Sequence, residues 1–464
     1  MGTLHRTISH LNNKLSHAQL QIYDPSNCSS TLWQQSWEPR TFPKLLHDSG
    51  YTTMFAGKYL NQYGYANAGG AEHVPPGWDW WAALIGQNYY YNYDMSLNGT
   101  RVHYGSNKRD YLTRVIENQA TDFIRHYHKE VPFFMMLCTT APHGPCTPEK
   151  KYKRKFQRKR APRTPSFNRY AENKHWLMEQ PKTALNQVDL AHIDKTFRKR
   201  WRSLQSVDAM LGRIVELLRR KQLLNNTILV FSSDNGYHLG QFRFSFGKCL
   251  PYETDIRVPF AIAGPRIPKK KIRREPIQSI DIAPTILDLA GIQSPQWFDG
   301  RSILQLFQTS RNRSHRKRQI STNWRTHFLV EYYGKSAGMI PKHCSYESNQ
   351  GLANCVLPNC VCKDAWNNTY SCLRRMKFNA AGSMNVNEIY CKFKDRVGFV
   401  EYYNLIKDPD ELVNNEANLP SVRSRNLAKK LTRLERCSGR NCFWNKKQQY
   451  NIKKLKKENT KKRV

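Results

Sequence analysis

Asp234 and Asn235 are the strongest candidates for chemistry in this sequence. They follow the apolar run 228–231 almost directly, and a short β-branched run that ends in polar residues is how an α/β protein delivers ligands to the carboxyl edge of its sheet. Both side chains offer hard oxygen atoms, which calcium and magnesium accept. Because Asp-Asn-Gly is also an ordinary turn sequence, the pair indicates a divalent-metal site only in combination with other residues.

Four other residues could work beside this pair. Lys58 lies in Gly57-Lys58-Tyr59-Leu60-Asn61, His143 lies in Ala141-Pro142-His143-Gly144-Pro145, and His238 and Lys248 follow Asn235 along the chain. Lysine supplies a positive charge that suits an anionic ligand, and histidine transfers protons near neutral or mildly acidic pH. Each of the four has a plain alternative as a solvated or loop side chain.

The elements that would position these residues alternate between helix and strand, which is the pattern of an α/β domain. Apolar spacing predicts an amphipathic helix over 109–128 and a second helical stripe over 207–218. The run 132–137 predicts a buried strand, and the run 228–231 predicts a second strand. Residues 147–200 are polar, basic and contain proline, so we expect little regular structure there.

The character of the chain changes near residue 320. Before it, a helix is expected over 281–290, with Gly291 as its C-terminal cap. After it, 328–333 and 398–405 are strand-like, and a cysteine cluster lies between them. We therefore predict three parts: an α/β domain over 1–320, a small disulfide-rich antiparallel subdomain over 321–445, and a basic disordered tail over 446–464.

The net charge of the chain is +38, which implies an anionic partner or an effect on solubility and says nothing about the fold. The plain explanation of the basic clusters is solvated loops and a disordered tail. The specific explanation is a surface for a polyanion, either sulfated glycosaminoglycan or nucleic acid. Nucleic acid ranks last, because we find no recognition-helix, zinc or aromatic-platform motif. The clusters are 150–160, 198–200, 269–274, 311–318 and the tail from Lys446.

The cysteines favour an oxidising compartment. Cys360-Val361-Cys362 is too tight for the usual zinc spacing, so a disulfide framework is expected rather than a metal site. Neither a signal peptide in residues 1–19 nor a stretch long enough to span a membrane is found. The framework would use Cys344, Cys355, Cys360, Cys362, Cys372, Cys391, Cys437 and Cys442, and five glycosylation acceptors support it: Asn27, Asn98, Asn225, Asn312 and Asn367.

Taken in order, these motifs resemble the type I sulfatase family, first its glucosamine-6-sulfatases and second its heparan sulfate endosulfatases. The resemblance runs from about Asn27 to Cys442. It implies an α/β fold, with an alkaline-phosphatase/sulfatase-like mixed sheet flanked by helices and a smaller antiparallel C-terminal domain. Further matching blocks are Asn27-Cys28-Ser29-Ser30, Gly69-Gly70-Ala71-Glu72-His73-Val74-Pro75, Asn173-Lys174-His175-Trp176-Leu177, Phe197-Arg198-Lys199-Arg200-Trp201, Tyr252-Glu253-Thr254-Asp255-Ile256-Arg257-Val258-Pro259 and Cys360-Val361-Cys362-Lys363-Asp364-Ala365.

The resemblance assigns roles to the candidate residues. Lys58 and Lys248 match the lysines that contact the sulfate, and His143 matches the histidine that faces the ester oxygen. Asp234 and Asn235 match two ligands of one calcium ion, and His238 matches a position that faces the substrate. These roles suit sulfate ester cleavage, which needs positive charge against a departing anion and a proton for the leaving alcohol.

The chain departs from the family in one respect, since it contains no Cys-x-Pro-x-Arg sequence. In the family this cysteine becomes formylglycine, whose hydrate is the nucleophile, and a paired Asp-Asp at the end of the first strand completes the calcium site. Alignment backwards from Asn27 places the motif near residues 2–6. We therefore expect the first strand and half of the calcium ligands to be missing, which would leave unpaired backbone groups and an open apolar face in the sheet. A truncated amino terminus would also account for the missing signal peptide.

The resemblance implies a sulfuric ester hydrolase that removes 6-O-sulfate from N-acetylglucosamine residues of heparan or keratan sulfate, in the lysosome or the secretory pathway. One alternative is a non-catalytic protein that binds sulfated glycans, which the net charge and the missing nucleophile motif favour. A second alternative is an endosulfatase-like enzyme, and a nucleic-acid-binding protein is a distant third.

Overall fold

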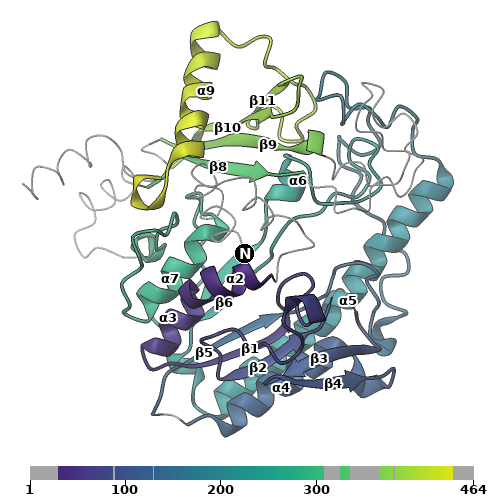
Figure 1. Cartoon of the computed structure of the whole chain (residues 1–464). Coiled ribbons are helices and arrows are strands. Elements are labelled where there is room, and N and C mark those ends of the chain that lie inside the picture. The colour runs from purple at the N-terminus through teal and green to yellow at the C-terminus, as the bar shows by residue number, and fades with distance from the viewer. Residues whose placement is uncertain are drawn as a thin grey trace, which may run out of the picture.

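The computed structural model describes residues 30–86, 89–128, 130–307, 324–334, 366–379 and 382–442. Figure 1 shows a lower part built on one sheet and an upper part built on another, with the long helix α5 (Gln187–Arg220) running along one side. Several predicted features lie outside the described residues: the glycosylation sites Asn27 and Asn312, the segment 2–6, the cysteines Cys344, Cys355, Cys360 and Cys362, and the tail 446–464.

The lower sheet has the strand order β4-β3-β2-β1-β5. Its parallel and antiparallel pairings confirm the predicted mixed sheet: β1 pairs in parallel with both β2 and β5, whereas β3 pairs antiparallel with β2 and with β4. Parallel pairing brings the carboxyl ends of β1 and β5 to the same edge of the sheet. The strands are β1 (Thr52–Lys58), β2 (Trp80–Leu84), β3 (Tyr93–Leu97), β4 (Thr100–Tyr104) and β5 (Phe133–Cys138).

Helices cover both faces of this sheet. On one face, α4 (Leu112–His126) and α5 form a core with apolar residues of β1, β2 and β3. On the other face, α3 (Phe42–Asp48) and α7 (Ile282–Leu289) pack around Phe134. The predicted helices 109–128 and 281–290 correspond to α4 and α7. The prediction for Gly291 is also confirmed, because its φ of 75° follows α7 directly and favours glycine.

The prediction of little regular structure over 147–200 is wrong in its last part, because α5 already begins at Gln187 and is 34 residues long. A capping box starts the helix: the Asn186 side chain accepts from the backbone N–H of Asp189, and the Asp189 side chain accepts from that of Asn186. The periodicity was hidden because several buried residues of α5 are polar. They are Asp189, Asp194, Ser203 and Ser206.

The strands β5 and β6 (Leu229–Ser232) have the predicted positions, but β5 is not buried as predicted. Every residue of β5 is half-buried, and in β6 the side chains of Val230 and Phe231 are 39% and 44% exposed. Within the described ranges β5 pairs only with β1, and β6 pairs only with β7 (Phe260–Ala263). Among the described residues, β5 and β6 therefore each have one edge without a strand partner.

The upper sheet is antiparallel with the order β11-β10-β9-β8, and α9 (Ser421–Arg436) packs on it. Cys372 and Cys391 are directly opposed in the β9–β10 pairing and form a disulfide, and Cys437 bonds Cys442. These bonds confirm the disulfide prediction for the described cysteines of the C-terminal part. The strands are β8 (His327–Tyr332), β9 (Tyr370–Phe378), β10 (Met384–Phe393) and β11 (Val400–Asn404).

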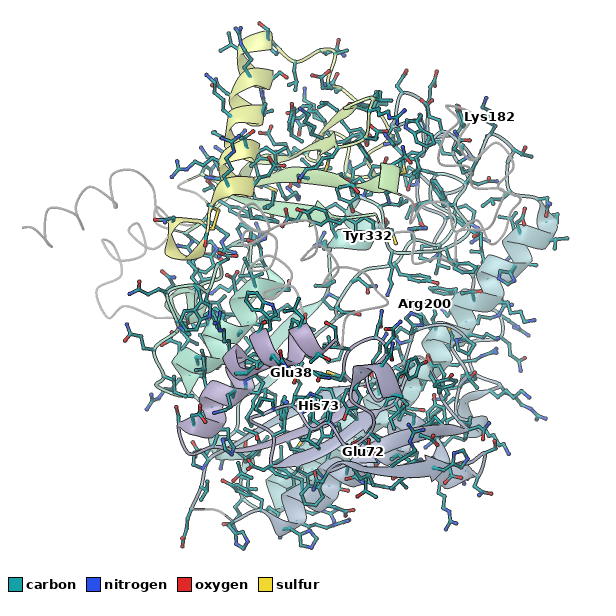
Figure 2. All side chains as sticks on the ribbon, in the orientation of Figure 1. Glu38, Glu72, His73, Lys182, Arg200 and Tyr332 are labelled. Atoms are coloured by element: carbon teal, nitrogen blue, oxygen red, sulfur yellow. A yellow bond between two sulfur atoms is a disulfide. The ribbon has the colours of Figure 1, made fainter. Side chains whose placement is uncertain are left out.

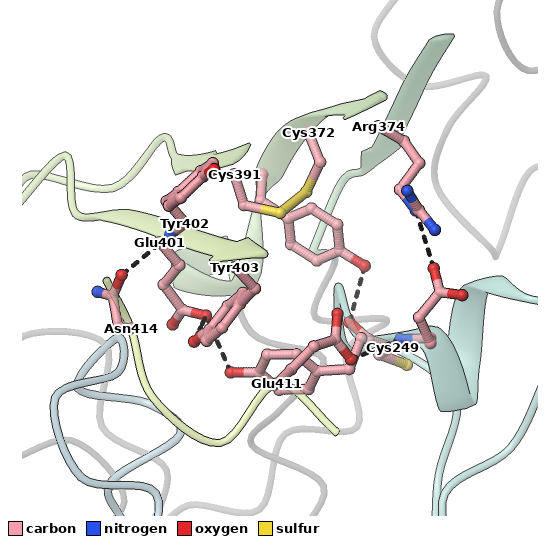
Figure 3. The surroundings of a disulfide bond; sticks show 12 residues. Cys249, Cys372, Arg374, Cys391, Glu401, Tyr402, Tyr403, Glu411 and Asn414 are labelled. Atoms are coloured by element: carbon pink, nitrogen blue, oxygen red, sulfur yellow. Dashed lines mark hydrogen bonds and ion pairs between the residues drawn. A yellow bond between two sulfur atoms is a disulfide. The ribbon is translucent and has the colours of Figure 1, made fainter. Parts of the chain in front are cut away.

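A buried polar junction, the Lys174 junction, joins the loop 171–178 to β11 and the segment after it. The Lys174 ammonium is 4.2–4.4 Å from the ring centres of Phe242, Tyr252 and Tyr403, and it donates to the Tyr403 hydroxyl and the Glu411 carbonyl at 2.5 and 2.6 Å. The Glu401 carboxylate beside it accepts from the hydroxyls of Tyr252 and Tyr403 and from the His175 N–H. Figure 3 shows Glu401 close to Tyr403. Burial, opposed by the negative charge of Glu401, lowers the pKa of Lys174 to about 8.

The remaining elements are short. No helix within the described ranges combines the length and the apolar character needed to cross a membrane. The short α-helices are α2 (Thr31–Ser36) and α6 (Glu253–Ile256), and short 3₁₀ helices cover Glu38–Arg40, Ala66–Ala68, Lys108–Asp110, Lys150–Tyr152, Leu224–Asn226, Ser279–Asp281, Leu304–Leu306, Trp366–Asn368 and Gly439–Cys442.

Candidate active site

Loops at the carboxyl ends of β1, β5 and β6 bring four of the predicted site residues together. Lys58 ends β1, His143 follows β5, and Asp234 follows β6. The pKa of the His143 imidazole is lowered, first by burial and then by the positive charges of Lys248 and Lys58, while Asp234 acts in the opposite direction. Such charge effects decrease with distance, so Lys58, Lys248 and Asp234 lie in the surroundings of His143, and these four residues are called the cluster.

The position of His143 is fixed through its backbone. Its N–H donates to the Thr140 carbonyl at 2.8 Å, and its own carbonyl accepts from the Cys146 N–H at 2.9 Å and from the Tyr90 hydroxyl at 2.7 Å. The ring nitrogen Nδ1 lies 2.9 Å from the Gly144 carbonyl oxygen. Since a carbonyl only accepts, Nδ1 carries the proton in this geometry and Nε2 is the nitrogen that can face a ligand.

Asp234 and Asn235 form a tight turn that is tied to the segment before β7. The Asn235 N–H donates to Asp234 Oδ1 at 3.0 Å, and the next N–H, that of Gly236, donates to the Asp255 carbonyl at 2.8 Å. Glycine is required at 236 because a Cβ there would lie 2.1 Å from the Thr254 carbonyl oxygen. This close backbone approach sets the turn at the sheet edge.

Lys248 connects the turn to the cationic part of the cluster. Its side chain is exposed, and its Nζ lies 3.3 Å from Asn235 Oδ1. Asp234 is exposed as well, whereas Lys58 and His143 are half-buried. The cluster therefore has a solvent-accessible side on which two lysines, one histidine and one carboxylate meet.

Asp234 and Asn235 fit a calcium ion in the kind of ligand they offer. A carboxylate and an amide oxygen are hard donors, and both residues closely follow the end of β6. They do not fit in number, because calcium takes about six to eight oxygen ligands. Among the described residues no group of three or more His, Cys, Asp or Glu side chains could hold a metal ion. In a calcium site Asp234 and Asn235 would be two of the ligands, and the others would have to come from other groups.

His238 follows Asn235 closely in the sequence, but it is buried, whereas Lys248 is exposed. Its side chain has no exposed surface, and Nδ1 lies 2.9 and 3.0 Å from the two carboxylate oxygens of Asp255. Asp255 also accepts from the backbone N–H of Leu250 at 2.9 Å. In this arrangement His238 supports the segment that carries Lys248, while its predicted contact with substrate stays a prediction.

Arg200 is a site residue that the sequence analysis placed only in a basic cluster and a matching block. It lies on α5 (Figure 2), where its guanidinium group donates to the Pro142 carbonyl at 3.0 Å and lies 3.7 Å from the ring centre of Tyr237. It therefore links the loop that carries His143 to the turn that carries Asn235. In the sequence Arg200 belongs only to the basic cluster 198–200 and the matching block 197–201. Neither pattern indicates that its partners are Pro142 and Tyr237, which are far away along the chain.

A second polar cluster supports the segment after Lys58. Glu38 is buried, and its carboxylate accepts from Trp33 Nε1 and Tyr59 Oη at 3.2 Å and pairs with His73 Nε2 at 2.7 Å. Figure 2 labels Glu38 and His73 on neighbouring segments of the lower part. Because Tyr59 directly follows Lys58, these bonds limit where the chain can place the lysine.

Three predicted glycosylation acceptors lie on described residues. Asn98 and Asn225 are exposed, although Asn98 Oδ1 accepts from the Trp81 N–H at 2.6 Å, and Asn367 is half-buried. Glycosylation at these asparagines stays a prediction.

Comparisons with known proteins agree with this fold. Residues 5–292 match the family model described as sulfatase, and residues 240–350 match the model described as N-sulphoglucosamine sulphohydrolase, C-terminal. The chain therefore belongs to the sulfatase family.

Among its relatives, the chain is 42% identical to N-acetylglucosamine-6-sulfatase of Homo sapiens over 419 residues, which cover 90% of this chain and 73% of that protein. It is 37% identical over 325 residues to the extracellular sulfatase SULF-1 homolog of Drosophila melanogaster, covering 69% of this chain and 28% of that protein. The predicted family and its glucosamine-6-sulfatase members are thus confirmed as the relatives of this chain.

Solved structures confirm the fold class. BT4656, solved in complex with its substrate D-glucosamine-2-N,6-O-disulfate, superposes with a TM-score of 0.62 at 21% identity, covering 84% of this chain and 81% of that chain. The phosphonate monoester hydrolase of Silicibacter pomeroyi superposes with a TM-score of 0.57 at 15% identity, covering 84% and 77%. At these identities the likeness concerns the fold.

Proposed function

We propose that the cluster of Lys58, His143 and Lys248 binds the 6-O-sulfate group of N-acetylglucosamine in a sulfated glycosaminoglycan. The observation that carries this proposal is that two lysines, Lys58 and Lys248, lie near His143 and help to lower its pKa. A sulfate ester carries one negative charge spread over several oxygens, which two flexible ammonium groups can bind from different sides.

Because the pKa of His143 is lowered, the protonation of this histidine would change when an anionic ligand binds. Without an anion, the neighbouring lysines and burial disfavour the imidazolium ion. A bound sulfate adds negative charge between the lysines, which raises the pKa of the histidine and favours its protonated form. His143 would then hold a proton next to the ester oxygen, where the leaving alcohol needs one.

Asp234 and Asn235 would hold a calcium ion, together with ligands outside the described residues. Calcium supplies positive charge that stabilises negative charge developing on the sulfate oxygens. His238 is assigned here to supporting the loop of Lys248.

Binding of N-acetylglucosamine 6-sulfate tests this function most directly. Titration calorimetry in the presence of calcium should detect binding, and Lys58→Ala and Lys248→Ala should each weaken it by about tenfold or more, as expected for the loss of a charge-assisted contact. Lys269→Ala, which removes an exposed lysine on another loop, is the matched control. Equal affinity in all four proteins would contradict the proposal.

The basic surface of the chain favours a second candidate, a protein that binds sulfated glycans without turning them over. The net charge of +38 supplies the attraction that such a role needs. Release of inorganic sulfate from N-acetylglucosamine 6-sulfate separates the candidates: release supports a 6-sulfatase, and binding without release supports the glycan-binding protein. An endosulfatase would instead release sulfate from within long heparan chains.

Two further assignments rest on the family rather than on the site. The disulfides and the exposed acceptors Asn98 and Asn225 support a lysosomal or secreted protein. The predicted division at about residue 320 is supported by the antiparallel sheet β8–β11, although the Lys174 junction ties that sheet firmly to the α/β part.

A further inference from the structure

The segment 150–160 is the most basic described surface of the chain. It contains no acidic residue, and every residue except Tyr152, Phe156 and Gln157 is Lys or Arg. All of its basic side chains are exposed. Within the described ranges residues 153–160 form no ion pair, and the nearest pairs along the chain are Lys151–Glu149 and Arg163–Asp194.

This segment is held in a defined position on α5. Arg202 donates to the Lys155 carbonyl at 2.6 Å, Arg198 donates to the Lys159 carbonyl at 3.1 Å, and Lys155 donates to the Gln205 side chain at 3.0 Å. Residues three and four apart share one helix face, so these partners come from a single face of α5. The basic segment is therefore a fixed surface and not a freely moving loop.

An exposed aromatic ring lies in the middle of the same face. Trp201 is 41% exposed, and its ring packs edge-on against Phe156 at 5.3 Å and against the buried Phe197 at 4.9 Å between ring centres. These two contacts orient the indole and leave part of it open to solvent. A rigid, partly exposed tryptophan surrounded by cations suits a ligand that has apolar faces and negative charges.

The cations beside Trp201 are close enough to repel one another. Burial and the positive charge of Arg198 lower the pKa of Arg202. Neither arginine is paired with an acid in the described part of the chain, so the repulsion is relieved when an anion binds.

We propose that this face, the α5 exosite, binds the chain of a sulfated glycosaminoglycan outside the candidate active site. The ring of Trp201 would contact the face of a sugar, while the surrounding basic groups would contact its sulfate and carboxylate groups. The exosite consists of the basic segment 153–160 together with Arg198, Trp201 and Arg202 of α5.

The exosite and the candidate active site use the same helix. Arg198, Trp201 and Arg202 belong to the exosite, whereas Arg200 points from α5 to the Pro142 carbonyl beside His143. The inference rests on the proposed function for its choice of ligand, because nucleic acid is also anionic and can stack on tryptophan. A sulfated glycan is favoured because the chain belongs to the sulfatase family.

Affinity for a heparin oligosaccharide, measured by calorimetry at several salt concentrations, tests the exosite. Lys153→Gln/Arg154→Gln should weaken binding by about tenfold and make its salt dependence shallower, because fewer counterions are released. Lys269→Gln/Lys271→Gln changes the net charge equally at exposed positions and should retain wild-type affinity. Equal losses in both double variants would overturn the proposal in favour of a general effect of charge.

A separate variant tests the aromatic contact in the exosite. Trp201→Ala should weaken heparin binding by about fivefold to tenfold while the salt dependence stays unchanged. An unchanged affinity in Trp201→Ala would remove the aromatic contact from the proposal, and tighter binding of a single-stranded RNA than of heparin at equal ionic strength would overturn the choice of ligand.

A failure of the exosite can be told apart from a failure of the active-site proposal. N-acetylglucosamine 6-sulfate is too small to use the exosite, so Lys153→Gln/Arg154→Gln should bind it as the wild type does. Loss of heparin binding with retained monosaccharide binding supports the exosite. Retained heparin binding in this double variant overturns the exosite and leaves the assignment of Lys58 and Lys248 untouched.

Discussion

The candidate active site and the Lys174 junction differ in how their lysines are exposed: Lys248 is accessible to solvent, whereas Lys174 is buried. In the junction the ammonium of Lys174 is enclosed by three aromatic rings, donates two hydrogen bonds and has the carboxylate of Glu401 nearby. In the candidate active site Lys248 is exposed, and its Nζ lies 3.3 Å from the amide oxygen of Asn235. Lys174 binds partners inside the protein, whereas Lys248 remains accessible to a ligand.

Because of this difference, we expect the buried lysine to affect stability and the exposed lysine to affect ligand binding. A buried cation is costly unless its partners compensate for lost solvation, so the junction tolerates little change. An exposed cation among other cations adds little to stability, but it gains energy when an anion arrives. Residues of the two regions should therefore respond to mutation in different assays.

Lys174→Met should have the largest effect on stability. It removes the ammonium from between Tyr403 and Glu411 and leaves the buried Glu401 without its cation, which costs about 3 kcal/mol of unfolding free energy. Urea unfolding measures this loss, and Lys269→Met at an exposed position is the control. A change below about 1 kcal/mol would show that the junction does not depend on its cation.

The same lysine predicts how stability changes with pH. Its pKa is about 8 in the folded chain against an ordinary value of 10.5. Between these values the unfolded state binds more protons, so this contribution to stability rises with pH from 8 to 10.5 and is lost as pH falls through 8. The wild type should gain stability over Lys174→Met across that interval, and parallel pH profiles would contradict the assignment.

Gly236→Ala should damage the active site through its backbone. A Cβ at 236 would lie 2.1 Å from the Thr254 carbonyl oxygen, so the turn carrying Asp234 must move, at a cost of about 2 kcal/mol. Thermal unfolding and calcium titration should both register the change. Gly212→Ala on α5 is the control, because a Cβ there meets nothing within 4 Å, and helix propensity predicts slightly higher stability.

Lys248→Ala should leave stability nearly unchanged, within about 0.5 kcal/mol. Binding of N-acetylglucosamine 6-sulfate should nevertheless weaken by about tenfold, because a charge-assisted contact with the sulfate is lost. Unfolding and calorimetry on one preparation give both numbers. A large loss of stability would place Lys248 with Lys174 and remove the contrast between the two regions.

The smallest expected effect is a pKa change at His143. Lys248→Ala removes one of the cations that lower the pKa of this histidine, so its pKa should rise toward the ordinary value. Because the folded-state pKa is depressed, the stability linked to His143 is present above the unfolded pKa and is lost as pH falls below it. NMR titration of the imidazole in both proteins measures the shift, and a lower pKa in the variant would contradict the geometry.

Much of the site could be predicted because its residues lie close to strand ends. Asp234 and Asn235 follow an apolar run within a few residues, and Lys58 and His143 each lie in a short motif with glycine and proline. Such local patterns need no information about distant partners. The helix α7 and its cap Gly291 were predictable for the same reason.

Other features depend on residues that are far apart in the chain. The start of α5 was missed because Asp194 and Ser206 are buried polar residues, satisfied by Arg163 and by Glu149 respectively. Arg200 became a site residue only through Pro142 and Tyr237, which come from two other segments.

The sequence by itself determined the alternation of helices and strands, the sulfatase motifs and the excess of positive charge, because these are properties of neighbouring residues and of composition. The tertiary structure decided which charges are enclosed and which stay accessible. Lys174 and Lys248 are both lysines in matching motifs, and only the packing of Tyr403 and Glu411 around the first distinguishes them. Burial and pairing fix the energy of a charge, and both depend on contacts between segments far apart in the sequence.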